Sequence, residues 1–306
     1  MDLRQLAALV AVAEHGTFSA AAKSLHTVQS NVSTHVARLE RELGVTLVDR
    51  TNGRLTDEGQ AVVERALRVQ NELDALASDV ASIGEEVTGG VRFGVIGSIA
   101  RWLVPRLLGA MRDAHPRVRL VIVEATTTSL VPQLLSGRLD LALLNLPVDD
   151  DEIVTETLFE EDLLVVAPEG HPLAERDEVS LVELAEHELL LGPPGTALRN
   201  ELDAEATAAG VMLRPQAELD GIRLIASLAF EGFGAAILPA TAVPGWLQGR
   251  WRRVTVPELT PRTVGAARRR RGLPSAPARA LADVLRGVVD EQGPGQPGLH
   301  LTSERE

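Results

Sequence analysis

The sequence lacks cysteine altogether, and this absence excludes three kinds of chemistry. No disulfide can staple the fold, no thiolate can ligate a metal, and no cysteine redox switch can operate. The N-terminus lacks the basic segment and continuous apolar core of a signal peptide, and no uncharged apolar run approaches roughly 18 residues. A cysteine-free chain suits a reducing compartment. We therefore expect a cytoplasmic protein with no membrane partner.

Motifs for catalysis and for cofactors are missing as well. The seven histidines show no metal-ligand spacing, and there is no G-x-S-x-G elbow. Two glycine-rich stretches, GVIGS and GFGAAI, lack the full dinucleotide fingerprint. The sequence therefore predicts no metal, no cofactor and no enzymatic activity.

Positive charge is scarce, because the net charge is −13. Such a balance argues against a chain that holds nucleic acid by bulk charge. The charge is unevenly spread, however. Residues 1–56 carry six Lys or Arg against five Asp or Glu, whereas residues 57–86 carry two against eight. Only the first segment could meet DNA without strong repulsion. The run from Arg268 to Arg271 resembles a nucleic-acid tract, but its acidic surroundings favour a solvated turn.

Proline and glycine are absent between Gln60 and Ile83, so one long helix is expected over residues 57–87, about 45 Å long. Its apolar residues recur at alternating spacings of four and three, the a/d seam of a coiled coil. The seam consists of Val62, Ala66, Val69, Leu73, Leu76, Val80, Ile83 and Val87. Such a narrow seam needs a matching helix and predicts a homodimer. The alternative is a single surface helix lying on its own domain.

Three helices and a hairpin precede this long helix. Helical spacing and cap residues predict a first helix ending at Gly16, a second over residues 18–25 capped by Thr17, and a third over residues 28–43 capped by Thr27. The third carries polar, mostly uncharged side chains on one face, as in a helix-turn-helix. Asn52-Gly53 between short apolar runs predicts a hairpin, or wing.

The head resembles a known family. The segments AAKSLHTVQSNVSTHVARLERELGVTLVDR and LTDEG are similar to the N-terminal signature of LysR-type transcriptional regulators, over about residues 2–60. Matching positions include Ala21, Ala22, Leu25, Gln29, Ser33, Leu39, Glu40, Leu43, Gly44, Leu47, Arg50, Leu55, Thr56 and Gly59. Val28 and Val48 depart from the pattern, but neither removes a donor that DNA needs.

Strands and helices alternate from Gly89 onward, which predicts a mostly parallel sheet. The resemblance extends to VPRLLGAMRDAHPRVRL, SGRLDLALL and FEGFGAAILP, and implies a sensor with crossings near residues 167–168 and 262–265. The expected class is α/β with an all-α N-terminal part. Its parts are a winged helix-turn-helix (1–58), a dimerising linker helix (59–88), a two-lobed periplasmic-binding-protein-like (type 2) effector domain (lobe I 89–167 and 265–290, lobe II 168–264) and a disordered tail (291–306).

Two sets of site residues follow. For DNA, polar and basic side chains of the third helix and the wing could contact base edges or phosphates. They are Gln29, Ser30, Asn31, Ser33, Thr34, Arg38, Arg50 and Arg54. The effector set lies at strand-to-helix turns, where hydroxyls and helix N-termini suit a small carboxylate. It comprises Ser98, Ile99, Thr127, Asn145, Gly195, Thr196 and Arg199, with Arg101 as a further carboxylate partner.

Each of these features also has a simpler explanation. The polar helix face could be a solvated surface, and each hydroxyl could be a plain helix cap. The family resemblance implies double-stranded operator DNA, a small-molecule effector and a homodimer or homotetramer as partners. The rival interpretation is a binding-protein-like carrier or enzyme with an accessory helical head. A gel shift on DNA upstream of the gene distinguishes the two.

Overall fold

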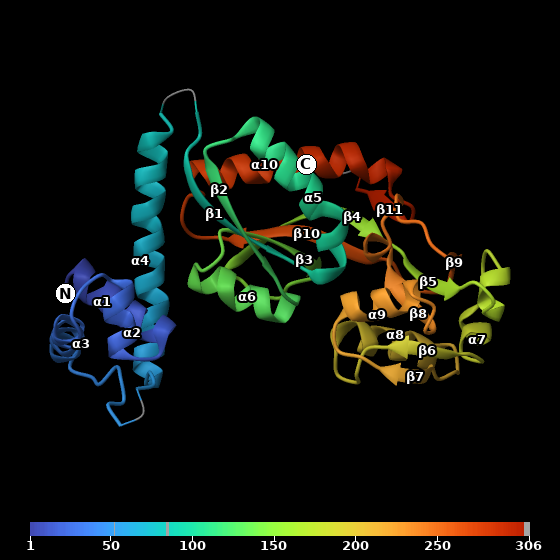
Figure 1. Cartoon of the computed structure of the whole chain (residues 1–306), viewed down its shortest axis with the longest axis horizontal. Coiled ribbons are helices and arrows are strands. Elements are labelled where there is room, and N and C mark those ends of the chain that lie inside the picture. The colour runs from blue at the N-terminus through green and yellow to red at the C-terminus, as the bar shows by residue number, and fades with distance from the viewer. Residues whose placement is uncertain (52, 84–85, 303–306) are drawn as a thin grey trace.

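The computed structural model describes residues 1–51, 53–83 and 86–302. A helical head and a long helix stand beside a two-lobed body (Figure 1). Within the described ranges, no helix is long and apolar enough to span a membrane.

The head is built on three helices with a shared core. They are α1 (Leu3–His15), α2 (Phe18–Ser24) and α3 (Gln29–Leu43). Leu9, Val36 and Leu39 are fully buried there. The predicted Thr27 cap is wrong: α3 follows Val28 without a side-chain cap, and the Thr27 hydroxyl instead accepts a hydrogen bond from the Asn31 amide at 3.0 Å.

The wing is shorter than its sequence pattern predicts. Two facing residues, Val48 and Leu55, form a single antiparallel bridge rather than two strands. The backbone N–H of Gly53 donates to the carbonyl of Asp49 at 2.8 Å and closes the turn. Asn52, the other half of the predicted Asn-Gly turn, lies outside the described residues.

The linker helix α4 (Asp57–Ala81) is 25 residues long, and so shorter than predicted. It ends where the Ser82 hydroxyl accepts a hydrogen bond from the Thr88 N–H at 3.1 Å, which turns the chain toward lobe I. Residues 84–85 of the predicted last turn lie outside the described ranges. The first seam residues, Val62 and Ala66, pack into the head core. The later ones are exposed: Val69 40%, Leu73 43%, Leu76 62%, Val80 60% and Ile83 82%.

Gly59 lets the first turn of α4 approach the wing. A Cβ at this position would overlap the carbonyl oxygen of Leu47 and lie 3.0 Å from its carbon, both backbone atoms that cannot swing away. We expect Gly59→Ala to lower the free energy of unfolding by about 1–3 kcal/mol through this overpacking. Gly109→Ala is the matched control, because Gly109 is also helical but has nothing within 4 Å. There alanine should raise stability by about 0.5–1 kcal/mol. Urea unfolding that finds equal shifts would contradict the close approach.

Lobe I is a six-stranded mixed sheet in the order β11-β4-β10-β3-β1-β2. Its strands are β1 (Gly89–Val95), β2 (Val118–Glu124), β3 (Leu141–Leu146), β4 (Ile153–Glu161), β10 (Arg262–Arg269) and β11 (Leu299–Leu301). Helices α5 (Gly97–Ala114) and α10 (Ala276–Gln292) cover one face, and α6 (Thr127–Ser136) covers the other (Figure 1). Strands β1, β2 and β3 are parallel, as predicted, and β10 is antiparallel to β3.

Lobe II is a five-stranded sheet in the order β7-β6-β8-β5-β9. Its strands are β5 (Leu163–Pro168), β6 (Glu188–Leu191), β7 (Arg214–Glu218), β8 (Ala235–Pro239) and β9 (Trp251–Thr255). Its helices are α7 (Leu181–Leu184), α8 (Ala197–Ala208) and α9 (Ile222–Phe230), with short 3₁₀ turns η1 (Pro172–Glu175) and η2 (Ala240–Ala242). Strand β8 lies at the centre of this sheet, and both β8 and its neighbour β5 are buried throughout.

The chain leaves lobe I at Asp162, between β4 and β5, and returns before Arg262. The predicted first crossing near residues 167–168 is therefore wrong, because the chain crosses before β5 begins and not where β5 ends. The apolar run Leu163–Pro168 already belongs to the core of lobe II. The second crossing lies where it was predicted.

The C-terminal segment is ordered, contrary to the predicted tail. After α10 the chain forms a 3₁₀ turn η3 (Gly293–Gly295), and β11 pairs with β4. Gln296 is 4% exposed; its amide donates to the carbonyl of Ala240 at 2.8 Å and accepts from the N–H of Gly245 at 2.9 Å. These bonds tie a Gly/Pro-rich segment, whose composition alone predicts disorder, to lobe II. Residues 303–306 lie outside the described ranges.

Candidate functional site

The recognition surface of the head is the outer face of α3. Gln29, Ser30, Thr34 and Arg38 are all exposed there. Within the described ranges their side chains have no hydrogen-bond or ion-pair partner. Helix α3 lies on the side of the head remote from lobe I (Figure 1). The body therefore leaves this face open to a duplex.

Two further predicted residues of α3 have partners inside the head. The Asn31 amide bonds the Thr27 hydroxyl, and the Ser33 hydroxyl accepts a bond from Arg50 at 3.3 Å. These contacts hold the first turn of α3 and connect it to the wing. Both residues can position the reading helix as well as touch DNA.

Arg50 joins α3 to the wing. Its guanidinium donates to the Glu40 carboxylate at 2.9 Å and lies 4.8 Å from the centre of the Phe18 ring. The other Glu40 oxygen accepts the backbone N–H groups of Leu47 and Val48. Burial raises the pKa of Glu40, but the hydrogen bonds from Leu47, Arg50 and Val48 outweigh it, so the pKa is lowered overall. Glu40 therefore stays ionised and fixes Arg50.

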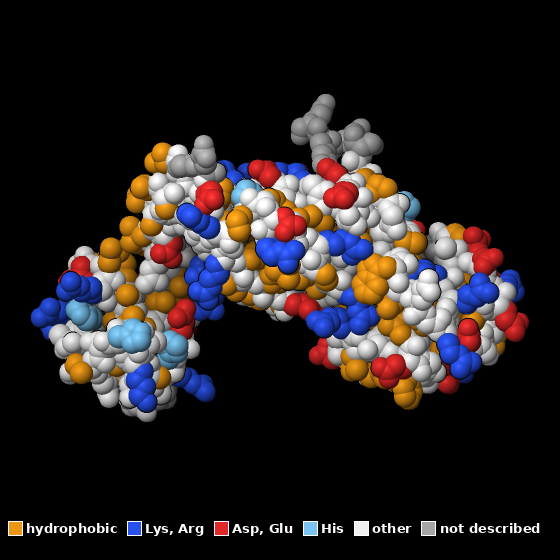
Figure 2. Space-filling model, turned by 45° about the horizontal axis from the view of Figure 1, so that its top comes forward, with side chains coloured by type: hydrophobic (Ala, Val, Ile, Leu, Met, Phe, Trp, Pro, Cys, Tyr) orange, Lys and Arg blue, Asp and Glu red, His pale blue; other side chains and the backbone are white. Residues whose placement is uncertain are grey.

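The charge distribution agrees with this surface. Lys and Arg side chains gather along the outer edge of the head, whereas acidic and basic side chains are mixed over the body (Figure 2). Arg38, Arg50 and Arg54 are all exposed on the head. Arginines around a polar helix favour phosphate contacts beside base contacts.

Ser98, Thr127 and Asn145 meet at the carboxyl ends of β1, β2 and β3. Ser98 is the second residue of α5 and is 4% exposed; Thr127 is the first residue of α6. The Thr127 hydroxyl accepts the backbone N–H of Asn145 at 3.2 Å. The side-chain oxygen of Asn145 is buried and has no partner in the described part of the chain. Lobe I thus brings these three predicted residues to one edge of its sheet.

Arg262 is a site residue that the sequence did not single out. Its guanidinium donates to the Ser98 hydroxyl at 3.1 Å and to the Glu161 carboxylate at 2.5 Å. The Arg262 side chain is 9% exposed and that of Glu161 is fully buried. Glu161 also accepts the N–H and hydroxyl of Thr241 at 2.9 and 2.6 Å. Arg262 lies at a predicted crossing, and this was the only signal for it.

Ser98 is therefore bonded to a network at the hinge. Glu161 ends β4 and Arg262 starts β10, so the pair occupies the two segments that join the lobes. The Nε atom of Arg262 is buried without a partner in the described part of the chain. A ligand oxygen could accept that unused N–H.

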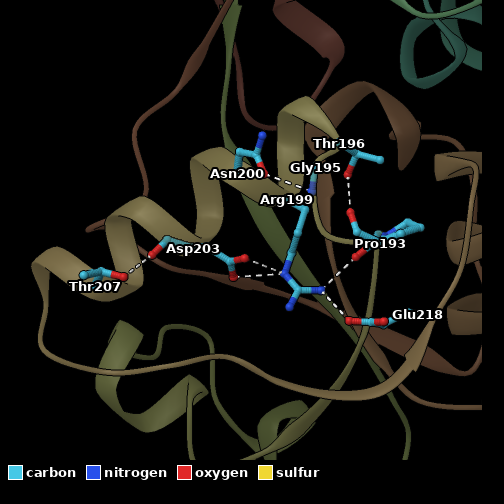
Figure 3. Close-up of polar contacts among 9 residues, drawn as sticks. Pro193, Gly195, Thr196, Arg199, Asn200, Asp203, Thr207 and Glu218 are labelled. Carbon is cyan, nitrogen blue, oxygen red and sulfur yellow. Dashed lines mark hydrogen bonds and ion pairs between the residues drawn. The ribbon is translucent and has the colours of Figure 1, made fainter.

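The predicted residues of lobe II form a separate cluster (Figure 3). The Arg199 guanidinium bonds Asp203 at 2.9 Å, Glu218 at 3.2 Å and the carbonyl of Gly192 at 2.8 Å. The Thr196 hydroxyl donates to the carbonyl of Pro193, and the Gly195 N–H donates to the side chain of Asn200. Arg199 is thus already neutralised by two carboxylates.

Two other predicted residues also have different roles. Ile99 is fully buried in the lobe I core. Arg101 stacks over the Phe230 ring of α9 at 5.5 Å, instead of awaiting a carboxylate. An ion pair between Glu124 and Arg223 likewise joins lobe I to α9. These two contacts hold the lobes in their present arrangement.

The fold and these surfaces define a class of protein: a DNA-binding head connected by a helix to a two-lobed ligand sensor. Comparison with known families agrees. Residues 3–60 match the family described as "Bacterial regulatory helix-turn-helix protein, lysR family", and residues 84–290 match the "LysR substrate binding domain". The chain belongs to the LysR family of transcriptional regulators. It is a regulator and not an enzyme.

Similar proteins include several named for a response to peroxide. The chain is 31% identical over 299 residues to the DNA-binding transcriptional dual regulator OxyR of Escherichia coli (strain K12), covering 95% of this chain and 96% of that protein. It is 38% identical over 247 residues to a probable hydrogen peroxide-inducible genes activator of Streptomyces viridosporus, covering 79% and 78%.

Solved structures share the whole architecture. Full-length OxyR from Pseudomonas aeruginosa, in a variant with aspartate in place of a cysteine, superposes with a TM-score of 0.76 at 26% identity, covering 100% of this chain and 99% of that one. Full-length CbnR in complex with its target DNA has a TM-score of 0.69 at 24% identity, covering 94% and 100%, and supports the fold alone.

Proposed function

We propose that this regulator reads its operator through α3 and the wing and responds to a small anionic effector, most simply a carboxylate, at the junction of the two lobes. It acts in the cytoplasm as a homodimer or a tetramer of such dimers. The observation that best supports the anionic effector is the environment of Arg262. Its side chain is 9% exposed, its guanidinium bonds the Ser98 hydroxyl, and its Nε–H has no partner in the described part of the chain.

Two helix N-termini support an anion at this place. Helices α5 and α6 begin at Gly97 and Thr127, beyond the carboxyl ends of β1 and β2. Neither has a side-chain cap bond, so first-turn N–H groups remain for a ligand. Their dipoles favour negative charge. The Arg262 guanidinium would supply a directed partner for a carboxylate.

Oxidation of a thiol cannot be the signal in this chain. The Streptomyces relative is named for hydrogen peroxide, and the Pseudomonas OxyR variant had a cysteine replaced by aspartate. The present sequence has no cysteine at any of its 306 positions. Without a thiol there is neither a sulfenate nor a disulfide to form. We infer that the shared architecture responds here to a non-covalent ligand.

The effector would act by shifting the lobe arrangement. It can bias the regulator only by its differential affinity for the two arrangements. In the present arrangement of the lobes, Arg223 of lobe II pairs with Glu124 of lobe I, and Arg101 of lobe I stacks over the Phe230 ring of lobe II. A ligand that bridges the lobes would compete with these contacts. The movement would pass through lobe I to α4 and the head.

Binding of the effector is tested by two hydroxyl deletions. A thermal-shift screen of carboxylates first finds one that raises the melting temperature by mass action. Calorimetry with that compound should show Thr127→Val and Ser98→Ala each weakening binding by about 1–3 kcal/mol, because a ligand acceptor loses its partner. Thr207→Val is the control, since that hydroxyl bonds only its own helix at Asp203. Wild-type affinity in both test variants would place the pocket elsewhere.

Reading and positioning of DNA can be separated by two variants. Gln29→Ala should cost about 1–3 kcal/mol on operator DNA and little on random DNA, because Gln29 is exposed and free to bond a base edge. Arg50→Ala should weaken binding to both DNAs and reduce the salt slope by about one.

Fluorescence anisotropy across a salt series on both duplexes measures these effects. The Arg50 variant also loses its bonds to Glu40 and Ser33, so circular dichroism should check the head. Equal losses on the two DNAs for Gln29→Ala would show that Gln29 is not a base reader.

A further inference from the structure

A groove of about 470 Å³ lies between the linker helix and lobe I, away from both sites above. One wall is α4, from Asn71 to Ser78. The other is the end of the lobe I sheet together with the loop that follows β10. Five arginines line it: Arg92, Arg119, Arg268, Arg269 and Arg271. The volume is that of a small-molecule site.

The strand register explains why these arginines converge. Arg119 of β2 pairs with Gly90 of β1, so it shares a sheet face with Arg92 two residues further on. On the other side of β1, the carbonyl of Arg92 accepts the backbone N–H of Asp140, and the N–H of Arg92 donates to the Asp140 carboxylate. Arg269 lies at the end of β10, the strand that pairs with β3. Arg268 of β10 and Arg271 of the loop that follows complete the set. Three of the four arginines in the run interpreted above as a solvated turn thus line a concave surface, and two of them, Arg268 and Arg269, belong to β10 rather than to a turn.

The charges of the groove are not balanced. Three carboxylates, Glu72, Asp74 and Asp140, face the five guanidinium groups, which leaves an excess of two positive charges in a chain of net charge −13. None of the five arginines forms an ion pair with any residue that the structure describes. Asp140 accepts the backbone N–H of Arg92 at 2.7 Å, and burial raises the pKa of its carboxyl. Like charges held close together favour a bound counter-ion.

Operator DNA is not that counter-ion. The reading helix α3 lies on the opposite side of α4 from lobe I (Figure 1). A duplex bound on α3 would have the head and α4 between itself and the groove. The ligand must therefore be a separate molecule that enters between α4 and the sheet.

We infer that this groove binds a small anion with two or more phosphate or sulfate groups. Arginine is suited to this because its planar fork bonds such groups bidentately. Arg119, Arg271 and Arg92 are exposed and without side-chain partners in the described ranges, so they can close on the ligand. The site does not depend on the effector proposed at the lobe junction. Its occupant touches both the sensor lobe and the linker helix.

Calorimetry with inorganic pyrophosphate on the full-length protein tests this site. The wild type should bind one pyrophosphate per chain. Arg119→Gln combined with Arg271→Gln should weaken binding at least tenfold, and both side chains are exposed, so the fold should be unaffected. Arg250→Gln is the matched control on lobe II, where that side chain is 90% exposed and bonds Glu169. The affinity of Arg250→Gln for pyrophosphate should stay within twofold of wild type.

Two further variants test whether pyrophosphate binds at the DNA-binding surface or at the lobe junction instead of in the groove. Arg38→Gln on α3 should leave pyrophosphate affinity within twofold, and so should Ser98→Ala at the lobe junction. No saturable binding to the wild type would overturn the inference. Unchanged affinity in the double variant, or a tenfold loss in Arg38→Gln, would also overturn it.

Discussion

Replacing Val69, Leu73 and Leu76 with aspartate should convert the protein into a monomer that has lost most of its operator affinity. These seam residues are 40%, 43% and 62% exposed on α4, although they are large and apolar. They follow the a/d spacing of a coiled coil, which buries such a stripe against a second copy. Three carboxylates on each helix would face three on its partner. Two linked heads gain from effective concentration, so a monomer loses a factor of about 10²–10⁴ in binding.

Sedimentation velocity and anisotropy on operator DNA measure both parts of this expectation. A matched control replaces Val182 and Met212, which are exposed apolar residues of lobe II at 51% and 83%. Val182→Asp with Met212→Asp adds charge at exposed apolar positions away from the seam and should remain a dimer. If the seam variant sediments as a dimer and binds normally, α4 is a surface helix and does not dimerise the protein.

The second large effect concerns the buried pair at the hinge. Glu161→Ala should lower the free energy of unfolding by about 3–5 kcal/mol, because Arg262 is left buried without its counter-charge. The Thr241 hydroxyl and N–H would also lose their acceptor. Glu161→Leu combined with Arg262→Leu should recover most of the loss, since apolar groups of similar volume replace a buried ion pair at little cost.

A double-mutant cycle in urea measures the coupling of this pair. Glu156→Ala is the control, because Glu156 also pairs with an arginine, Arg286, but both side chains are partly exposed at 42% and 36%. That exposed pair should be worth no more than about 1 kcal/mol. If Glu161→Ala also lowers the free energy of unfolding by no more than about 1 kcal/mol, the hinge network does not stabilise the fold.

Periodicity and capping predicted the parts of this protein that depend on local sequence. The three head helices, the exposed seam and the polar face of α3 follow from spacings of three and four residues, which a helix turns into faces. Gly59, named only for its place in the family pattern, proved to have a physical reason in its contact with Leu47. Ser98, Thr127 and Asn145 lie at one edge of lobe I because strand ends of a parallel sheet meet there, whereas their contact with an effector stays a prediction.

What the sequence could not supply were pairings across long separations. Arg262 and Glu161 are 101 residues apart, and no pattern near either one points to the other. Arg199 was predicted as a carboxylate partner for a ligand, but Glu218 of β7 reaches it across the lobe and Asp203, one helical turn further along α8, also pairs with it. The segment around β11 was predicted to be disordered because it is rich in glycine and proline, but its pairing with β4 and the Gln296 hydrogen bonds to lobe II order it.

We propose that this LysR-type sensor, which has no cysteine, regulates transcription through a non-covalent ligand. A footprint of the wild-type protein on the DNA upstream of its gene tests this most directly, before and after micromolar hydrogen peroxide. We expect a protected inverted repeat that peroxide leaves unchanged and that a carboxylate from the thermal-shift screen alters reversibly. A footprint that peroxide changes, and that stays changed after the peroxide is removed, would contradict it.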